Sequence, residues 1–533
     1  MIAGPIRNIP QNRVAHSRLA VAARMLRKHA LILAIVIFAA PFYFTWTWND
    51  GIGELGGDGA NYLMMAQHYS PYRSANPAAA EAATFSRFPP LYPVVLAWLD
   101  PAVDLPRAHV ATTACLMLAL IALYAWLRRE RASTGQAALL VLLFAALPGS
   151  WLAGLSVQSE YLYLLLSLVA LTLMAAYQQG GRNEALYGAA LAVAATVLTR
   201  TIGISLFAPL ILVLWRAPRR SAFIALTMAM LPLLAWHLVH QSENSYGESL
   251  IWLYRGRVWE ALRTQLAGEL PALRKGFGDN FLLGANPRFL ADALGLLAMA
   301  GVAWRAVKLR PDGIYVAAYL AILLVWPYPE EAQRFLWVLV PLLLAQPILS
   351  IAEFRRELAD ARVPRLITAT SAGTILLMVL PALALAADRY RSAAYADLPG
   401  ARGLVPWYDA DPVAAEQVVS TEVILINAMQ SIPQQVPASD CVLATRPDLV
   451  NYFGRRRSVF PPLGSMPDSE YPAAQRQSGC RYVFGMSSTD KRYPDPLYPL
   501  RRADPKLEFL YVSKLSDAVG HPKFVIAALA RLK

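Results

Sequence analysis

The chain has 533 residues, of which 56% are hydrophobic and only 16% are charged, and its formal net charge is +13. About a quarter of the residues of a soluble domain are charged, so this composition excludes an ordinary soluble protein and indicates a polytopic membrane protein. The basic residues stand mainly in short clusters between apolar runs, which is the pattern that orients membrane proteins, and so we expect no nucleic-acid partner.

The first predicted element is a membrane span, Ala30–Trp48, preceded by a basic segment at residues 1–28. The positive-inside rule places this N-terminus in the cytoplasm. An external loop from about 49 to 90 follows the span. The apolar segment Leu91–Leu99 is too short to cross a bilayer, which takes about 20 residues.

Further apolar runs predict ten more spans, for about 11 in all. They lie at about 108–127, 135–153, 158–177, 184–199, 201–215, 221–240, 289–304, 313–327, 335–352 and 366–387. The basic clusters at 128–131, 216–220, 305–310 and 355–365 all fall on the cytoplasmic side of this arrangement. A second external loop covers 241–287, and its segment 251–273 predicts either a helix in the outer interface or a loop helix packed on the C-terminal domain.

The segment 388–533 differs from the rest because it has no apolar run long enough to span. Strands predicted at Cys441–Thr445 and Arg481–Gly485 indicate a small α/β domain. We therefore divide the chain into a transmembrane domain, 1–387, and a C-terminal domain, 388–533, that is periplasmic if the host is a bacterium. Cys441 and Cys480 form a disulfide there or remain free buried thiols; the sequence leaves both open.

Asp58 is the first candidate for chemistry because it stands between two glycines, just outside the first span. Glycine lets the backbone turn sharply and lets another group approach closely. A carboxylate at this position is suited to act as a general base toward an acceptor hydroxyl. The alternative is a simple helix N-cap, and Asp50 and Glu54 are competing carboxylates.

Three arginines, Arg87, Arg200 and Arg334, lie on the same predicted side as Asp58. Arginine binds phosphate oxygens through its planar fork, so these residues are candidates for binding a lipid phosphate. The alternatives are snorkelling and ion pairs with Glu330 or Glu331. Glu160 opens the fourth span, where an acidic group is either functional or favoured by the helix dipole.

No metal-binding or nucleotide-binding pattern stands out. The seven histidines are scattered, no Cys-x-x-Cys pair occurs, and no Walker-type loop is present. We therefore expect no cofactor, although a divalent metal remains open.

Four short motifs resemble those of the polytopic GT-C glycosyltransferases, in particular the bacterial relatives of the protein O-mannosyltransferases and of the aminoarabinose transferase that modifies lipid A. Asp58–Ala66 is similar to the class's Asp-x-x-x-Tyr-x-x-x-Ala, and Phe88–Pro93 to its Pro-Pro-Leu-Tyr-Pro. Ser159-Glu160 and Arg334-Phe335-Leu336 with Pro341 resemble a polar-Glu pair and an Arg-Tyr-Leu-Pro pattern. The chain departs from the class in having Phe88 where relatives often have Lys, and a single Asp58 where an acidic pair is usual.

The resemblance implies a GT-C-like helical bundle in the inner (plasma) membrane of a bacterium. It implies transfer of a sugar, with inversion, from a polyprenyl-phosphate donor to a hydroxyl of a lipid, glycan or protein acceptor. We expect Asp58 to be the base. The residues expected to bind substrate are Tyr62, Arg87, Tyr92, Glu160, Arg200 and Arg334.

Two other function classes remain. A secondary transporter needs ionisable groups deep in its spans and repeated halves, and neither is visible in the sequence. A non-catalytic scaffold of an envelope assembly, in which Asp58 is only a helix cap, is compatible with the same sequence.

Overall fold

A computed structural model describes most of the chain. The described residues are 11–48, 52, 58–72, 76, 78–80, 83, 88–99, 105–239, 250–251, 253–256, 258–282, 288–326, 328–354, 362–392, 412–462, 466–467, 469–486, 497–502, 507–516 and 522–532. Arg87, Asp50 and Glu54 lie outside them.

The described part is mostly helical. Its first half contains α1 (Gln11–Thr47), α2 (Gly59–Tyr69), α4 (Leu91–Ala97), α5 (Leu105–Arg129), α6 (Thr134–Ala146), α7 (Pro148–Gly154), α8 (Glu160–Gly180), α9 (Asn183–Thr199), η1 (Thr201–Leu206), α10 (Phe207–Trp215) and α11 (Arg219–Val239). Its second half contains α13 (Val258–Leu282), α14 (Arg288–Val307), α15 (Pro311–Leu324), η2 (Pro329–Glu331), α16 (Ala332–Trp337), α17 (Val340–Phe354), α18 (Arg362–Ser392), α19 (Pro412–Gln435), α20 (Pro447–Phe453), α21 (Tyr471–Gln477) and α22 (Tyr498–Arg501).

Five described helices are long and apolar enough to cross a membrane. They contain His29–Thr47, Leu105–Arg129, Glu160–Gly180, Arg219–Leu238 and Arg288–Val307. The other six predicted spans coincide with apolar helices of 10–17 residues, so the expected count of 11 stays a prediction. The chain is a multi-pass membrane protein, and large apolar side chains on α11, such as Leu231 and Leu238, are exposed as lipid contact requires.

Local sequence signals explain where several helices begin and end. Ser133 and Gln136 form a reciprocal capping box at the start of α6. The span predicted at 135–153 is divided into α6 and α7, because Leu147 precedes Pro148 and adopts an extended backbone that a proline favours in its predecessor. α8 ends at Gly181, whose φ of +64° lies in the left-handed region.

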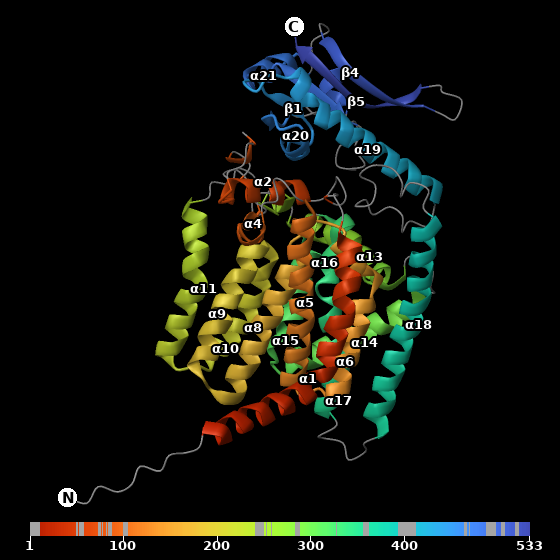
Figure 1. Cartoon of the computed structure of the whole chain (residues 1–533). Helices are drawn as coiled ribbons and strands as arrows, with labels where there is room; N and C mark the ends of the chain where they lie inside the picture. The colour runs from red at the N-terminus through yellow and green to blue at the C-terminus, as the bar shows by residue number, and fades with distance from the viewer. Residues whose placement is uncertain are drawn as a thin grey trace, which may run out of the picture.

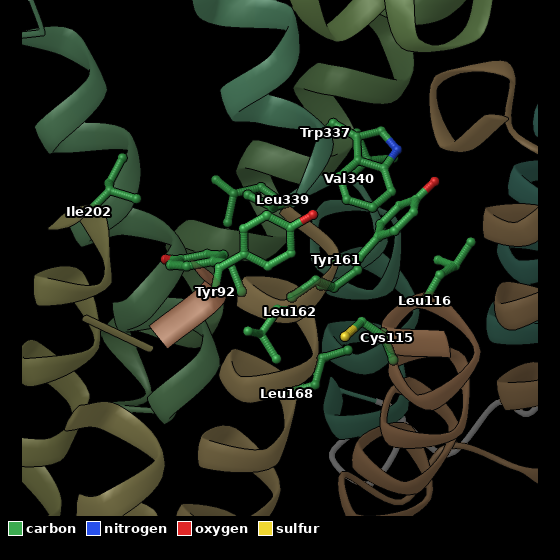
Figure 2. Close-up of a cluster of buried hydrophobic side chains, with 14 of the residues drawn as sticks. Tyr92, Cys115, Leu116, Tyr161, Leu162, Leu168, Ile202, Trp337, Leu339 and Val340 are labelled. Atoms are coloured by element: carbon green, nitrogen blue, oxygen red, sulfur yellow. The ribbon is translucent and has the colours of Figure 1, made fainter. Parts of the chain in front are cut away.

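The helices pack around a core that includes several buried aromatic side chains. Tyr92, Tyr161 and Trp337 come from α4, α8 and α16 and lie close together with Cys115 of α5 (Figure 2). Tyr161 and Trp337 contact each other with ring centroids 5.0 Å apart. α4, which supplies Tyr92, lies beside α2 at the end of the bundle nearest the C-terminal domain (Figure 1).

A buried ion cluster joins four elements of the bundle. Arg305 of α14 is fully buried, and its Nε lies 2.7 Å from Oδ2 of Asp312 on α15. Its Nη2 lies 2.6 Å from Glu130, just after α5, and its Nη1 lies 3.4 Å from Glu353 on α17. Paired charges of this kind hold their helices together, because removing one partner leaves the others buried and uncompensated.

The C-terminal domain contains a five-stranded sheet. The strands are β1 (Val442–Ala444), β2 (Ser458–Val459), β3 (Tyr482–Met486), β4 (Leu507–Ser516) and β5 (Pro522–Leu532). Their order is β2-β1-β3-β5-β4; β1 is parallel to β2 and β3, and β5 is antiparallel to β3 and β4. Cys441 and Cys480 form a disulfide. Cys441 immediately precedes β1, and Cys480 stands two residues before β3. The domain boundary at 387/388 stays a prediction.

The C-terminal domain rests on the bundle through α20, which lies above α2 at the end opposite the first residues of α1 (Figure 1). Asn76 donates from Nδ2 to the carbonyl oxygen of Asn451 at 3.0 Å. Tyr452 packs on Met64 of α2. The helix that follows Asp58 is therefore held between the bundle and the C-terminal domain.

Candidate active site

Asp58 immediately precedes α2, but its side chain makes no helix-cap hydrogen bond. Its Oδ2 instead lies 2.7 Å from Nη2 of Arg334. The backbone here is tightly enclosed: a Cβ on Gly59 would lie 2.8 Å from the carbonyl oxygen of Ile52 and 3.3 Å from that of Val157. Glycine is thus required after Asp58, and the carboxylate takes part in an ion pair rather than in capping.

Arg334 lies in α16 and bonds to carboxylates from three other segments. Its Nη2 donates to Asp58, its Nε donates to Oε1 of Glu160, and its Nη1 lies 3.5 Å from Oε2 of Glu331. The guanidinium brings together chain positions that are as many as 276 residues apart. We call Asp58, Glu160, Arg200, Glu331 and Arg334 the outer-end cluster.

Glu160 is the most deeply buried carboxylate of the outer-end cluster. It begins α8, its side chain is 2% exposed, and its Oε1 is shared between Arg334 and Arg200, whose Nη1 lies at 2.5 Å. Arg200 also donates to Ser159 Oγ at 3.3 Å and lies over the ring of Phe335, 5.2 Å from its centroid. Both arginines are thereby oriented by one buried carboxylate and the start of one helix.

The side chain of Tyr62 packs beside the outer-end cluster. Its hydroxyl lies 3.0 Å from Ser159 Oγ, which links α2 to the same serine that Arg200 contacts. Its ring meets the edges of Phe88 and Tyr92, with centroids 5.3 and 5.1 Å away. The hydroxyl of Tyr92 is bonded to Thr112 at 2.8 Å, so Tyr92 supports Tyr62 in the core and does not reach the ion pairs.

The outer-end cluster contains three carboxylates and two guanidinium groups, and these charges shift the pKa values of its members. Burial raises the pKa of the Glu331 carboxyl above its usual range, although the neighbouring Arg334 opposes that rise. Burial alone would lower the pKa of Arg334, but Glu160, Asp58 and Glu331 outweigh it and raise that pKa well above its usual range. Both arginines are thus cations.

The structure brings together four of the predicted site residues, Asp58, Glu160, Arg200 and Arg334, with Tyr62 beside them. Sequence reasoning treated Glu331 only as a surface partner of an arginine. The signal that would have indicated it is its spacing: it stands three residues before Arg334 on the same turn. Among the residues that the structure describes, no group of three or more His, Cys, Asp or Glu is arranged to hold a metal ion.

No protein-family model matches the chain, and no curated protein matches it. Solved structures do match. ArnT from Cupriavidus metallidurans bound to undecaprenyl phosphate is 14% identical, with 94% of this chain and 98% of that chain covered at a TM-score of 0.44. The apo state of that ArnT is 13% identical, with 96% and 98% covered at 0.44.

An oligosaccharyltransferase from Archaeoglobus fulgidus tethered with an acceptor peptide is 11% identical, with 95% of this chain and 74% of that chain covered at a TM-score of 0.41. These structural neighbours are GT-C glycosyltransferases, the class that the sequence motifs resemble.

Proposed function

We propose that the chain is a membrane glycosyltransferase that moves a sugar from a polyprenyl-phosphate donor to an acceptor hydroxyl, on the outer face of the bacterial inner membrane. The observation that carries the proposal is the outer-end cluster, in which Asp58 lies 2.7 Å from Arg334 and Arg334 shares Glu160 with Arg200. Carboxylates beside paired arginines, at the end of a bundle of apolar helices, suit a reaction between a lipid phosphate and a hydroxyl.

The proposed reaction is a single displacement with inversion at the anomeric carbon. The acceptor oxygen forms a bond to that carbon while its proton passes to the Asp58 carboxylate. The bond between the anomeric carbon and the phosphate oxygen breaks, and the electron pair leaves with the lipid phosphate. Arg334 and Arg200 stabilise the negative charge that develops on the leaving phosphate, and their orientation by Glu160 means that little reorganisation is needed.

The surroundings of the cluster support the remaining parts of the proposal. The chain's own apolar helices give a lipid-linked donor access to the cluster from the bilayer. The C-terminal domain lies over α2 through α20 (Figure 1), and we place the acceptor near this junction. The acceptor in this proposal is a hydroxyl of a lipid, glycan or protein, and the transferred sugar is a hexose or a pentose.

The test is transfer of labelled sugar from a mixture of polyprenyl-phosphate sugars by the full-length protein, compared with Asp58→Asn at equal membrane levels. We expect transfer by the wild type and a loss of at least about a hundredfold in the variant, since general-base catalysis contributes about 10²–10⁴-fold. Asp292→Asn is the matched control, because Asp292 pairs with an arginine at an exposed site on α14. Equal transfer by Asp58→Asn would remove Asp58 as the base.

A further inference from the structure

Arg334 has a different carboxylate on each of its three nitrogens. Nε donates to Glu160, Nη2 lies 2.7 Å from Asp58, and Nη1 lies 3.5 Å from Glu331. A phosphate that binds an arginine in the usual bidentate way needs two of these nitrogens. A bidentate phosphate on either edge would therefore share or take over nitrogens that already contact carboxylates.

The two edges of the guanidinium differ in how firmly their carboxylates are held. Glu160, on Nε, is 2% exposed and is fixed a second time by Arg200 at 2.5 Å. On the other edge, the side chains of Asp58 and Glu331 are 23% and 35% exposed. A ligand that arrives at the cluster meets the Nη1–Nη2 edge, because this is the edge whose partners retain access from outside.

We propose that the donor's phosphate takes the Nη1–Nη2 edge of Arg334, displaces Asp58 and Glu331 from it, and thereby frees Asp58 to act as the base. Glu160 stays on Nε and keeps the guanidinium in place. This inference rests on the proposed function and adds an order to it: the donor binds first, and the base becomes available only after that.

The exchange follows from simple electrostatics. A carboxylate that is paired with an arginine is a weak base, since the cation stabilises its charged form. When an anionic phosphate takes the cation, Asp58 loses that stabilisation and gains a like charge nearby, and both changes raise its affinity for a proton.

The exchange makes an unusual prediction for binding. If Asp58 and Glu331 compete with the phosphate, their removal strengthens phosphate binding, even though Asp58→Asn abolishes transfer. The experiment measures equilibrium binding of undecaprenyl phosphate to the full-length protein in nanodiscs, for wild type, Asp58→Asn, Glu331→Gln and the control Asp292→Asn. We expect the first two variants to bind roughly tenfold more tightly than wild type, and the control to match wild type.

Two further probes identify which part of the ligand is recognised. Undecaprenol, which lacks the phosphate, should show no difference between wild type and the two variants. Inorganic phosphate should show the same order of affinities at weaker absolute binding, because the competition is for the arginine alone. If the variants instead gain affinity for undecaprenol as well, the gain comes from altered lipid contacts, and the exchange is wrong.

The outcomes separate this inference from the proposed function. If Asp58→Asn loses transfer but binds undecaprenyl phosphate no more tightly than wild type, Asp58 is a base without an exchange. If wild type neither transfers sugar nor binds the lipid phosphate, the proposed function fails and the exchange with it. Glu331→Gln carries the binding test independently should Asp58→Asn unfold, and unchanged or weaker binding by a folded Glu331→Gln would also overturn the exchange.

Discussion

Asn61, one turn after Asp58 on α2, donates a hydrogen bond from Nδ2 to Oδ2 of Asp448 on α20, over 3.3 Å. The carboxylate of Asp448 is itself oriented by Arg446, whose Nε and Nη2 lie 3.0 and 2.8 Å from its two oxygens. The C-terminal domain thus reaches the helix of the candidate base through a polar contact as well as through Tyr452.

From this contact we predict that the C-terminal domain positions Asp58. Asn61→Ala should lower the rate constant for sugar transfer about fivefold, since one hydrogen bond to a charged group contributes about 1 kcal/mol at a half-exposed site. The exchange pair Asn61→Asp with Asp448→Asn keeps one donor and one acceptor and should restore most of the rate. The measurement is a double-mutant cycle on transfer, with KM and kcat separated.

The matched control for that cycle is Asp440→Asn, because Asp440 pairs with Arg481 at 2.7 Å in the same domain, away from α2. It should leave transfer unchanged. Additive effects of the two single substitutions, with no rescue by the pair, would mean that the contact has no part in positioning the base.

Glu160 should be indispensable for stability as well as for binding. Glu160→Ala leaves Arg200 and Arg334 without their shared carboxylate, and breaking a buried pair in this way costs about 3–5 kcal/mol of unfolding free energy. Thermal unfolding of the purified variant measures the loss. Undecaprenyl phosphate binding should also fall, because both guanidinium groups lose the partner that orients them.

Arg305→Ala is the comparison for Glu160→Ala. It breaks the buried cluster with Asp312 and Glu130, so we expect a loss of stability of similar size. Binding of undecaprenyl phosphate per folded molecule should persist in this variant, since the residues of that cluster make none of the contacts of the outer-end cluster. If both variants lost binding equally, Glu160 would have only a structural role.

The pH dependence of phosphate binding should depend on Glu331. Burial raises its pKa. The charges of Asp58 and Glu160 raise this pKa further, whereas those of Arg334 and Arg200 lower it. As the pH falls through this raised pKa, Glu331 becomes neutral and ceases to compete for Arg334, so the advantage of Glu331→Gln over wild type should vanish. We expect the ratio of the two dissociation constants to fall from roughly ten toward one as the pH is lowered from neutral through this pKa.

Using the ratio removes the effect of the ligand's own titration, because the second pKa of a phosphate monoester is about 6 in both measurements. A ratio that stays constant over this range would show that Glu331 does not titrate in competition with the ligand. The same group would contribute stability below the pKa of an unfolded glutamate and lose that contribution as the pH rises through its folded pKa.

The disulfide should stabilise the C-terminal domain. Cys441 and Cys480 are 39 residues apart, and closing a loop of that length in the unfolded chain corresponds to about 4 kcal/mol in the chain-entropy model. Replacing both cysteines with alanine should therefore make the domain unfold at lower denaturant and speed its proteolysis. Cys115→Ala is the control, because Cys115 is a free buried cysteine of α5. Equal protease resistance with and without the bridge would contradict the prediction.

Much of the architecture was predictable from sequence because its signals are local. Apolar runs indicated the bundle, and Leu91–Leu99 was correctly interpreted as too short to span. The break between α6 and α7 also has a local signal, because Pro148 favours an extended backbone at Leu147. The disulfide stayed open because it depends on β1 and β3 being neighbours, a contact across the chain.

Four of the five members of the outer-end cluster were predictable, but their connections were not. The positive-inside pattern placed Asp58, Arg200 and Arg334 on one predicted side of the membrane, and short motifs singled out Asp58, Glu160 and Arg334. The guanidinium of Arg334 contacts Asp58, Glu160 and Glu331. These contacts depend on how α2, α8 and α16 pack together, and no local property of the three segments encodes that packing.

The separation of these residues along the chain also governs when the protein first becomes able to work. Asp58 leaves the ribosome long before Arg334, and α20, which holds α2 from above, follows still later at Pro447–Phe453. During synthesis and insertion the early part of the chain therefore has an aspartate without its arginine. On the proposed function, a growing chain has no assembled centre with which to consume donor lipid, and competence arrives only when the C-terminal domain has been synthesised and has folded onto α2.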